Sequence, residues 1–203
     1  MSGFALSAMA RDGAGWIGSW SPGIGDPTAA GWLATLGYFA AAWSCYGAAQ
    51  RIGPALLSAQ MLRRESRIWQ MLAALLAALG VNKQLDLQSA LTELGRIAAR
   101  SGGWYGERRG VQFVFIACIA LAGAAAAIAA LWTARRTSPP VRLAVAGALA
   151  ILAFVVVRAA SFHHFDIATS REVLGLRVGS LVELAGIAVV LTTAGWRQRQ
   201  LRG

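Results

Sequence analysis

Five long apolar stretches constrain the fold of this chain more than any other feature of its sequence. They lie at residues 29–49, 67–86, 111–134, 141–162 and 177–196. A helix needs about 20 residues to cross the ~30 Å hydrocarbon core of a bilayer, and each stretch has about that length. Only 14% of the residues are charged, whereas an ordinary soluble domain has about 25%. The sequence therefore predicts an all-α membrane protein with about five transmembrane helices.

A shorter amphipathic helix is expected between the second and third stretches. Apolar residues recur there at the spacing of one helix face, whereas the charged residues lie off that face. Gly102 and Gly103 follow and are expected to end the helix. We expect it to lie on the outer surface of the membrane or to pack over the mouth of the bundle. The apolar residues are Leu87, Leu91, Leu94 and Ala98, and the charged residues are Glu93, Arg96 and Arg100.

The first 28 residues differ from the rest in being rich in Gly, Ser and Pro without a continuous apolar run. They do not fit the pattern of a cleaved signal peptide, so the first apolar stretch would act as the insertion signal. Asp26 before Pro27 has the order of a helix N-cap and first helical residue. We predict an irregular outer segment over 1–28 and a single transmembrane helical bundle over 29–203, with no internal repeat.

The arginines favour one of the two possible orientations. With the N-terminus outside, ten arginines fall on the inner side and seven on the outer side, and the inner loops are shorter. Basic residues concentrate in short cytoplasmic loops, so the N-terminus is predicted outside and the C-terminus inside. For a bacterial inner (cytoplasmic) membrane, the outer side is the periplasm. The ten inner arginines are Arg51, Arg63, Arg64, Arg67, Arg135, Arg136, Arg142, Arg197, Arg199 and Arg202.

Four charged residues are predicted at a similar depth inside the spans, namely Lys83, Asp86, Arg158 and Glu183. Charges in a span are rare and normally face the protein interior or a wet cavity. Lys83, the only lysine, can reach Asp86 three residues on, and Asn82 shares a helix face with Asp86. We expect Lys83 or Asp86 to contact Arg158 or Glu183. Three roles remain open: a structural salt-bridge network, ligand or proton chemistry, and snorkelling to the headgroups.

The segment SFHHFD at 161–166 contains both histidines of the chain. On a regular helix His163 and Asp166 share a face, whereas His164 points about 100° away. We therefore predict that no metal is held by His163 and His164 together. Asp26, Asp86 or Glu172 would have to complete a site built on His163, and no zinc or haem motif is present. Ser161, His163, His164 and Asp166 are interpreted as polar contacts of the outer face. The alternative is acid–base chemistry by one of the histidines.

Arg108, Arg109 and Gln112 form a further polar group at the outer end of the third stretch. Paired arginines can hold a phosphate or carboxylate bidentately, and the simpler alternative is a headgroup anchor.

The small residues at 123–130 predict that the third span is central in the bundle. Gly175, Gly179 and Gly186 are spaced for close packing in the fifth span. Cys45 and Cys118, both inside predicted spans, are expected to be small core residues.

Three segments resemble parts of bacterial integral membrane proteins to which no activity is attached. They are NKQLDLQ (82–88), GWYGERRGVQ (103–112) and RAASFHH (158–164), within the middle and C-terminal two-thirds of the chain. The resemblance implies a bacterial source and an ordered outward face, and it transfers no catalytic residues.

Two functional hypotheses follow. The first is a non-catalytic subunit or binding module of a larger membrane complex, with the lipid bilayer and other membrane subunits as partners. The second is a small membrane enzyme or transporter that uses an outward charged pocket. No complete catalytic set or cofactor motif appears, so the sequence leaves both enzymatic activity and cofactors unassigned. The net charge of +10 is attributed to topology and lipid headgroups, because no nucleic-acid-binding module is recognisable.

Overall fold

The computed structural model describes residues 15–52, 59–102, 108–160, 172–173 and 176–202, and their side chains except at 59, 88, 99, 108–120, 157–160, 172–173 and 176–178. Six helices occupy most of this part of the chain, so the all-helical class is confirmed. The helices are α2 (Ala29–Gln50), α3 (Ala59–Leu85), α4 (Leu87–Ser101), α5 (Arg108–Ala134), α6 (Pro139–Ala160) and α8 (Val178–Gln200). Two short antiparallel strands, β1 (Glu172–Val173) and β2 (Leu176–Arg177), precede α8.

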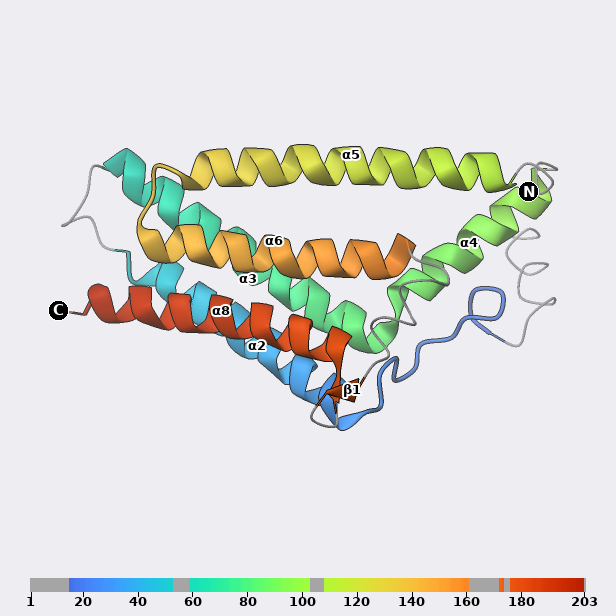
Figure 1. The fold of residues 1–203 in the computed structure, drawn as a ribbon, viewed down its shortest axis with the longest axis horizontal. Helices are drawn as coiled ribbons and strands as arrows, with labels where there is room; N and C mark the ends of the chain where they lie inside the picture. Colours follow the sequence, from blue (N-terminus) through green and yellow to red (C-terminus); the bar gives the residue numbers. More distant parts are fainter. Residues whose placement is uncertain (1–14, 53–58, 103–107, 161–171, 174–175, 203) are drawn as a thin grey trace, which may run out of the picture.

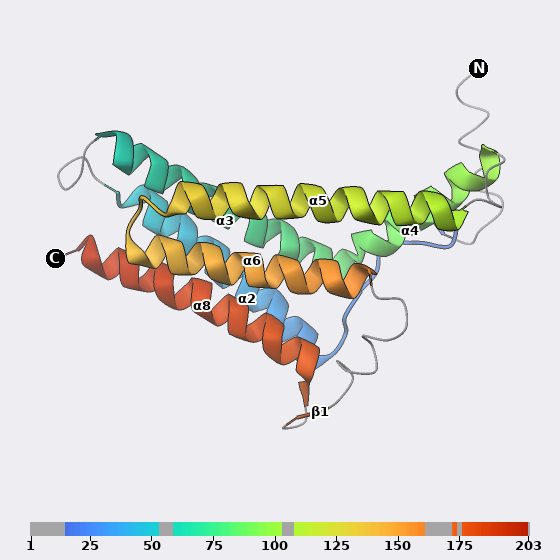
Figure 2. The same cartoon turned by 45° about the horizontal axis from the view of Figure 1, so that its top comes forward.

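Successive long helices run in opposite directions, and α4 leaves the bundle at one end (Figures 1 and 2). The end of α2, the turn between α5 and α6 and the C-terminus lie together at the opposite end. Each of the five apolar stretches corresponds to a helix, and the amphipathic stretch corresponds to α4, with Gly102 as its C-cap.

Helix α3 begins eight residues before the predicted start at residue 67, at Ala59. Its first turns contain Arg63, Arg64 and Glu65, which were expected in a loop because their charges lower the hydropathy. Arginine, glutamate and leucine are nevertheless good helix formers, so polarity alone does not end a helix.

The N-cap of helix α2 lies two residues after the expected position. Thr28, not Asp26, is the N-cap, and its hydroxyl oxygen accepts from the Gly31 N–H at 3.0 Å. The Asp26 carboxylate instead accepts from the backbone N–H and hydroxyl of Thr28. This leaves the second oxygen of Asp26 available for a more distant partner.

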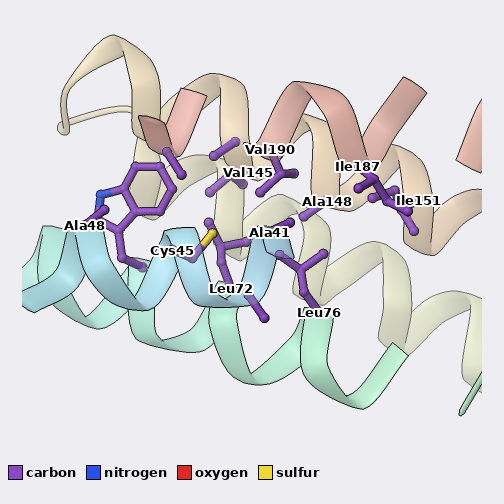
Figure 3. Packing of buried hydrophobic residues seen from close by; sticks show 14 of the residues in the cluster. Ala41, Cys45, Ala48, Leu72, Leu76, Val145, Ala148, Ile151, Ile187 and Val190 are labelled. Atoms are coloured by element: carbon purple, nitrogen blue, oxygen red, sulfur yellow. The ribbon is translucent and has the colours of Figure 1, made fainter. Parts of the chain in front are cut away.

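The core lies between α2, α3, α6 and α8. Helix α2 packs extensively against α3 and α8, and α6 packs against α8, whereas α3 and α6 contact each other less. Small residues of α2 (Ala41, Cys45 and Ala48) meet larger apolar residues of the other helices (Figure 3). Cys45 is thus a buried core residue, as expected, whereas the side chain of Cys118 lies outside the described residues. Helices α6 and α8 approach closely where a Cβ added at Gly186 would lie 2.5 Å from Ile151 Cγ1. Gly175 lies outside the described residues.

The prediction that the span with small residues at 123–130 is central was wrong for the described part of α5. This helix packs against α6 at the edge of the bundle. Leu121 and Ile128 are exposed, and a Cβ at Gly123 would meet nothing within 4 Å. Small residues permit a close helix contact but do not create one, since the neighbouring helix must also fit.

Within the described residues, two helical segments are long and apolar enough to cross a membrane, Pro139–Val156 of α6 and Gly179–Gln200 of α8. Leu121–Ala134 of α5 is apolar but shorter. Length and composition therefore point to membrane association for two of the five predicted spans.

Candidate functional site

The charged cluster predicted within the bundle centres on an ion pair between α3 and α8. Lys83 Nζ lies 2.8 Å from Glu183 Oε2, and the two side chains are only 9% and 5% exposed. The end of α3 and the beginning of α8 lie at the same end of the bundle, which brings residues 100 positions apart into contact. This confirms the expected contact between Lys83 and Glu183.

Two further side chains complete the cluster and were not assigned to it from the sequence. The Tyr38 hydroxyl of α2 donates to Glu183 Oε1 at 2.9 Å. Lys83 Nζ lies 3.2 Å from the free oxygen of Asp26, Oδ2. A tyrosine among the alanines of one helix face was a possible signal for a polar contact, but the pattern does not identify a partner 145 residues away.

The segment before α2 is fastened to the end of α3 beside this cluster. The Gly25 N–H donates to the Gln84 carbonyl at 2.6 Å, and the Gln84 side-chain amide donates to the Thr35 hydroxyl at 3.0 Å. Burial raises the pKa of Asp26, but hydrogen bonds from Thr28 and Lys83, with the charge of Lys83, outweigh it and leave that pKa below its ordinary value. Asp26 is therefore held as a carboxylate.

The structure does not place Asp86 in the cluster. Helix α3 ends at Leu85, and Asp86 adopts a left-handed conformation (φ 47°) that turns the chain into α4. Aspartate tolerates this conformation better than most residues. The exposed Asp86 carboxylate accepts from the Ser89 hydroxyl, and the Asn82 carbonyl accepts from the Asp86 N–H at 3.0 Å. The bend at Asp86 breaks the three-residue helical spacing on which the Lys83–Asp86 prediction depended.

A second buried ion pair lies at the opposite end of the bundle. Arg197 Nη2 of α8 is 2.7 Å from Glu65 Oε2 of α3, and Ser138 donates to the other Glu65 oxygen. The sequence placed Arg197 on the inner side, outside the predicted span, and Glu65 was not assigned to any site. Both side chains are buried, because the start of α3 and the end of α8 converge with the start of α6.

Several predicted site residues lie outside the part of the chain whose side chains are described. Arg158 belongs to the last turn of α6, and Arg108, Arg109 and Gln112 to the first turns of α5, so only their backbones are placed. Ser161, His163, His164 and Asp166 lie outside the described residues altogether. Among the described residues, no group of three or more His, Cys, Asp or Glu side chains could hold a metal ion.

The observed cluster favours one of the three roles considered for its charges. Lys83 and Glu183 turn inward and pair, which is opposite to the outward orientation of snorkelling side chains. One ammonium group between two carboxylates, with a tyrosine hydroxyl on the deeper one, joins α2, α3, α8 and the segment before α2. The arrangement therefore favours a structural role, in which these contacts specify how the elements dock. Comparison with protein-family models, with curated proteins and with solved structures gave no match for this chain.

Proposed function

We propose that this protein is a five-span bacterial inner-membrane protein that serves as a non-catalytic subunit or binding module of a larger membrane complex. Helices α2, α3, α5, α6 and α8 are the spans, with the N-terminus outside and the C-terminus inside. The Lys83–Glu183 pair then lies toward the outer face.

Exposed apolar residues on α2 support its assignment as a span. Large side chains such as Leu36, Phe39 and Trp43 point away from the bundle, and Trp43 is 76% exposed. A soluble monomer rarely leaves such a continuous apolar face in water, whereas acyl chains cover it without cost. Tryptophan and tyrosine at the end of a span also suit the headgroup region.

The arrangement of the helix ends supports the orientation. The start of α3, the turn between α5 and α6 and the end of α8 share one end of the bundle (Figure 1). These three elements contain most of the ten arginines predicted to be cytoplasmic. Arg135 also lies over the ring of the exposed Trp132, 4.4 Å from its centroid, an arrangement typical of a membrane-interface anchor.

The outer face of α5 is the observation that carries the proposed subunit role. Ala127, Ala130 and Ala134 face α6, as their burial shows. The opposite face presents an exposed row at steps of four, three and four, in which one small residue, Ala125, lies among large ones. Such a face allows another transmembrane helix to approach closely and interdigitate. The row consists of Leu121, Ala125, Ile128 and Trp132.

Copurification in a mild detergent or native nanodiscs tests the proposal. We expect other membrane proteins at fixed stoichiometry with the parent chain, and their loss on Ala125→Leu, because the larger side chain blocks helix approach. Ala40→Leu, at an exposed alanine of α2, is the matched control and should retain them. Isolation of the 21.3 kDa chain alone, or equal retention in both variants, would contradict the subunit role.

A small membrane enzyme or transporter is the second candidate, favoured by the net negative charge of two carboxylates around one lysine near the outer end. It ranks lower because these groups already satisfy one another. A purified single chain that transports or transforms a solute, and loses this activity in Lys83→Met while remaining folded, would favour it over the subunit role.

A further inference from the structure

Helix α4 exposes its apolar face instead of packing it against the bundle. Leu91 at the centre of the face is 58% exposed, and its neighbours Leu87 and Leu94 are each 43% exposed. The helix runs obliquely away from the end of α3 toward the beginning of α5 (Figures 1 and 2). The face formed by Leu87, Leu91 and Leu94, the leucine stripe, is thus left open by the described residues.

The segment before α2 contacts a different side of α4. Glu93 is buried and accepts from the Ser19 N–H at 3.3 Å, while Arg96 Nη1 lies 2.8 Å from its other oxygen. Ala90, on the same side, is also buried. At about 100° per residue this side lies roughly a quarter turn from the leucine stripe. The contact therefore fixes the rotation of α4 without covering its leucines.

The connections at both ends of α4 hold it near the boundary of the proposed membrane. Only Asp86 separates α4 from the last residue of α3, and six residues, 102–107, separate it from α5. Both neighbours are proposed spans, and an extended residue reaches at most ~3.6 Å. Helix α4 consequently cannot move far from the depth at which α3 ends and α5 begins.

We propose that α4 lies in the boundary between headgroups and acyl chains of the outer leaflet, with the leucine stripe inserted into the lipid. This rests on the proposed five-span arrangement. An amphipathic helix in this position buries its apolar face about 5–10 Å deep. Arg96, on the opposite face, meets the aqueous side of the headgroups. Trp16, 81% exposed on the segment bound to Glu93, is a further interfacial anchor.

Spin-label accessibility in the full chain, purified free of partner subunits so that the outer face of α5 meets lipid, tests the assignment. Single cysteines at Leu91, Arg96 and Ile128 are labelled in a background with Cys45→Ala and Cys118→Ala, in nanodiscs of phosphatidylcholine and phosphatidylglycerol. The measured quantity is the ratio of the label's collision rate with oxygen to its collision rate with a water-soluble nickel complex. We expect this ratio to be severalfold higher at Leu91 than at Arg96. Leu94 replaces Leu91 if the labelled variant is less stable than its parent.

Ile128 on α5 separates the failure of this inference from failure of the five-span proposal. A lipid-exposed label at Ile128 with a water-exposed label at Leu91 would overturn only the surface position of α4. A label at Leu91 shielded from both reagents would also overturn it, because the stripe would then pack against protein. A water-exposed label at Ile128 would overturn the five-span proposal itself.

Discussion

Lys83 has an ammonium group in a nearly dry position, and its two carboxylate partners determine whether it is tolerated there. Glu183 is the deeper partner and is also held by Tyr38, whereas Asp26 is closer to the surface. A buried ion pair does not necessarily add net stability over an apolar pair, but removing one partner leaves an uncompensated charge. The pair is therefore a sensitive point of the fold.

We predict that Glu183→Gln or Lys83→Met lowers the free energy of unfolding by about 3–5 kcal/mol. The double variant Lys83→Met with Glu183→Leu should lose less than the sum of its single changes. Reversible unfolding in mixed micelles measures both. Arg96→Met, which breaks a partly exposed pair with Glu93, is the control and should change stability by no more than about 1 kcal/mol. Equal losses at both sites would contradict the assignment of Lys83–Glu183 as the buried pair.

Asp26 should make the free energy of unfolding depend on pH in the acidic range. Burial raises the pKa of Asp26, but hydrogen bonds from Thr28 and Lys83 and the charge of Lys83 outweigh burial, so the folded-state pKa lies below the ordinary value. A lowered pKa stabilises the fold above the unfolded-state pKa of about 3.9, and this contribution is lost as the pH falls through the folded-state pKa. The stability difference between the parent and Asp26→Asn should thus shrink from pH 6 to pH 3. A gap that stays constant or widens would refute this.

At the scale of elements, helix contacts are determined by the sizes of the residues on facing surfaces. Gly186 of α8 and Gly147 of α6 lie where the two helices approach most closely. The described part of α5 has equally small residues yet forms no comparable close contact on its outer face. Complementary surfaces on both partners, and not small residues on one, produce the tight contact.

Gly186→Ala should destabilise the protein by roughly 1–3 kcal/mol, because the added Cβ overpacks a tight contact. It would lie 2.5 Å from Ile151 Cγ1, and a β-branched side chain has little rotamer freedom to move aside. Gly195→Ala on the same helix meets nothing within 4 Å. This control should be neutral or gain up to about 1 kcal/mol from helix propensity. Thermal unfolding of the two variants side by side decides the matter, and a tolerated Gly186→Ala would disprove the close approach.

At the scale of the whole molecule, buried ion pairs occupy both ends of the four-helix core. Lys83–Glu183 joins α3 to α8 at one end, and Glu65–Arg197 joins the same two helices at the other. The apolar residues of Figure 3 fill the region between them. Two separated polar contacts between the same helices fix their relative rotation and offset more strictly than apolar packing alone.

The two ion pairs share no side chain and should contribute independently. The loss of stability in Glu65→Gln with Glu183→Gln should equal the sum of the single losses within about 0.5 kcal/mol, as for well-separated sites. Denaturant unfolding of the four proteins gives this coupling energy. A coupling of several times that size would show that one pair forms only when the other is present.

The topology can be tested by a reporter that is active only in the cytoplasm, fused after residue 203. An active fusion is expected, since five crossings from an outer N-terminus leave the C-terminus inside. A second fusion after Gly102, beyond α4, should be inactive although expressed. A stable but silent fusion at residue 203 would contradict the orientation and the outward position of the Lys83 cluster.

Most helix boundaries could be predicted from the sequence alone, because apolar length and glycine stops are local properties. The first apolar stretch matches α2 within one residue at each end, and Gly102, one of the two glycines expected to end α4, is its C-cap. The contact between Lys83 and Glu183 could also be anticipated, because helical rise converts sequence position into position along the bundle.

Which side chains meet follows from the tertiary structure. The contacts of Tyr38 with Glu183 and of Glu65 with Arg197 join residues more than 130 positions apart, and they depend on how each helix is rotated about its axis. The edge position of the described part of α5 and the bend at Asp86 likewise depend on neighbours that no local pattern specifies. Rotation and neighbour choice follow from the fit of whole helix surfaces, which exists only once the helices have packed.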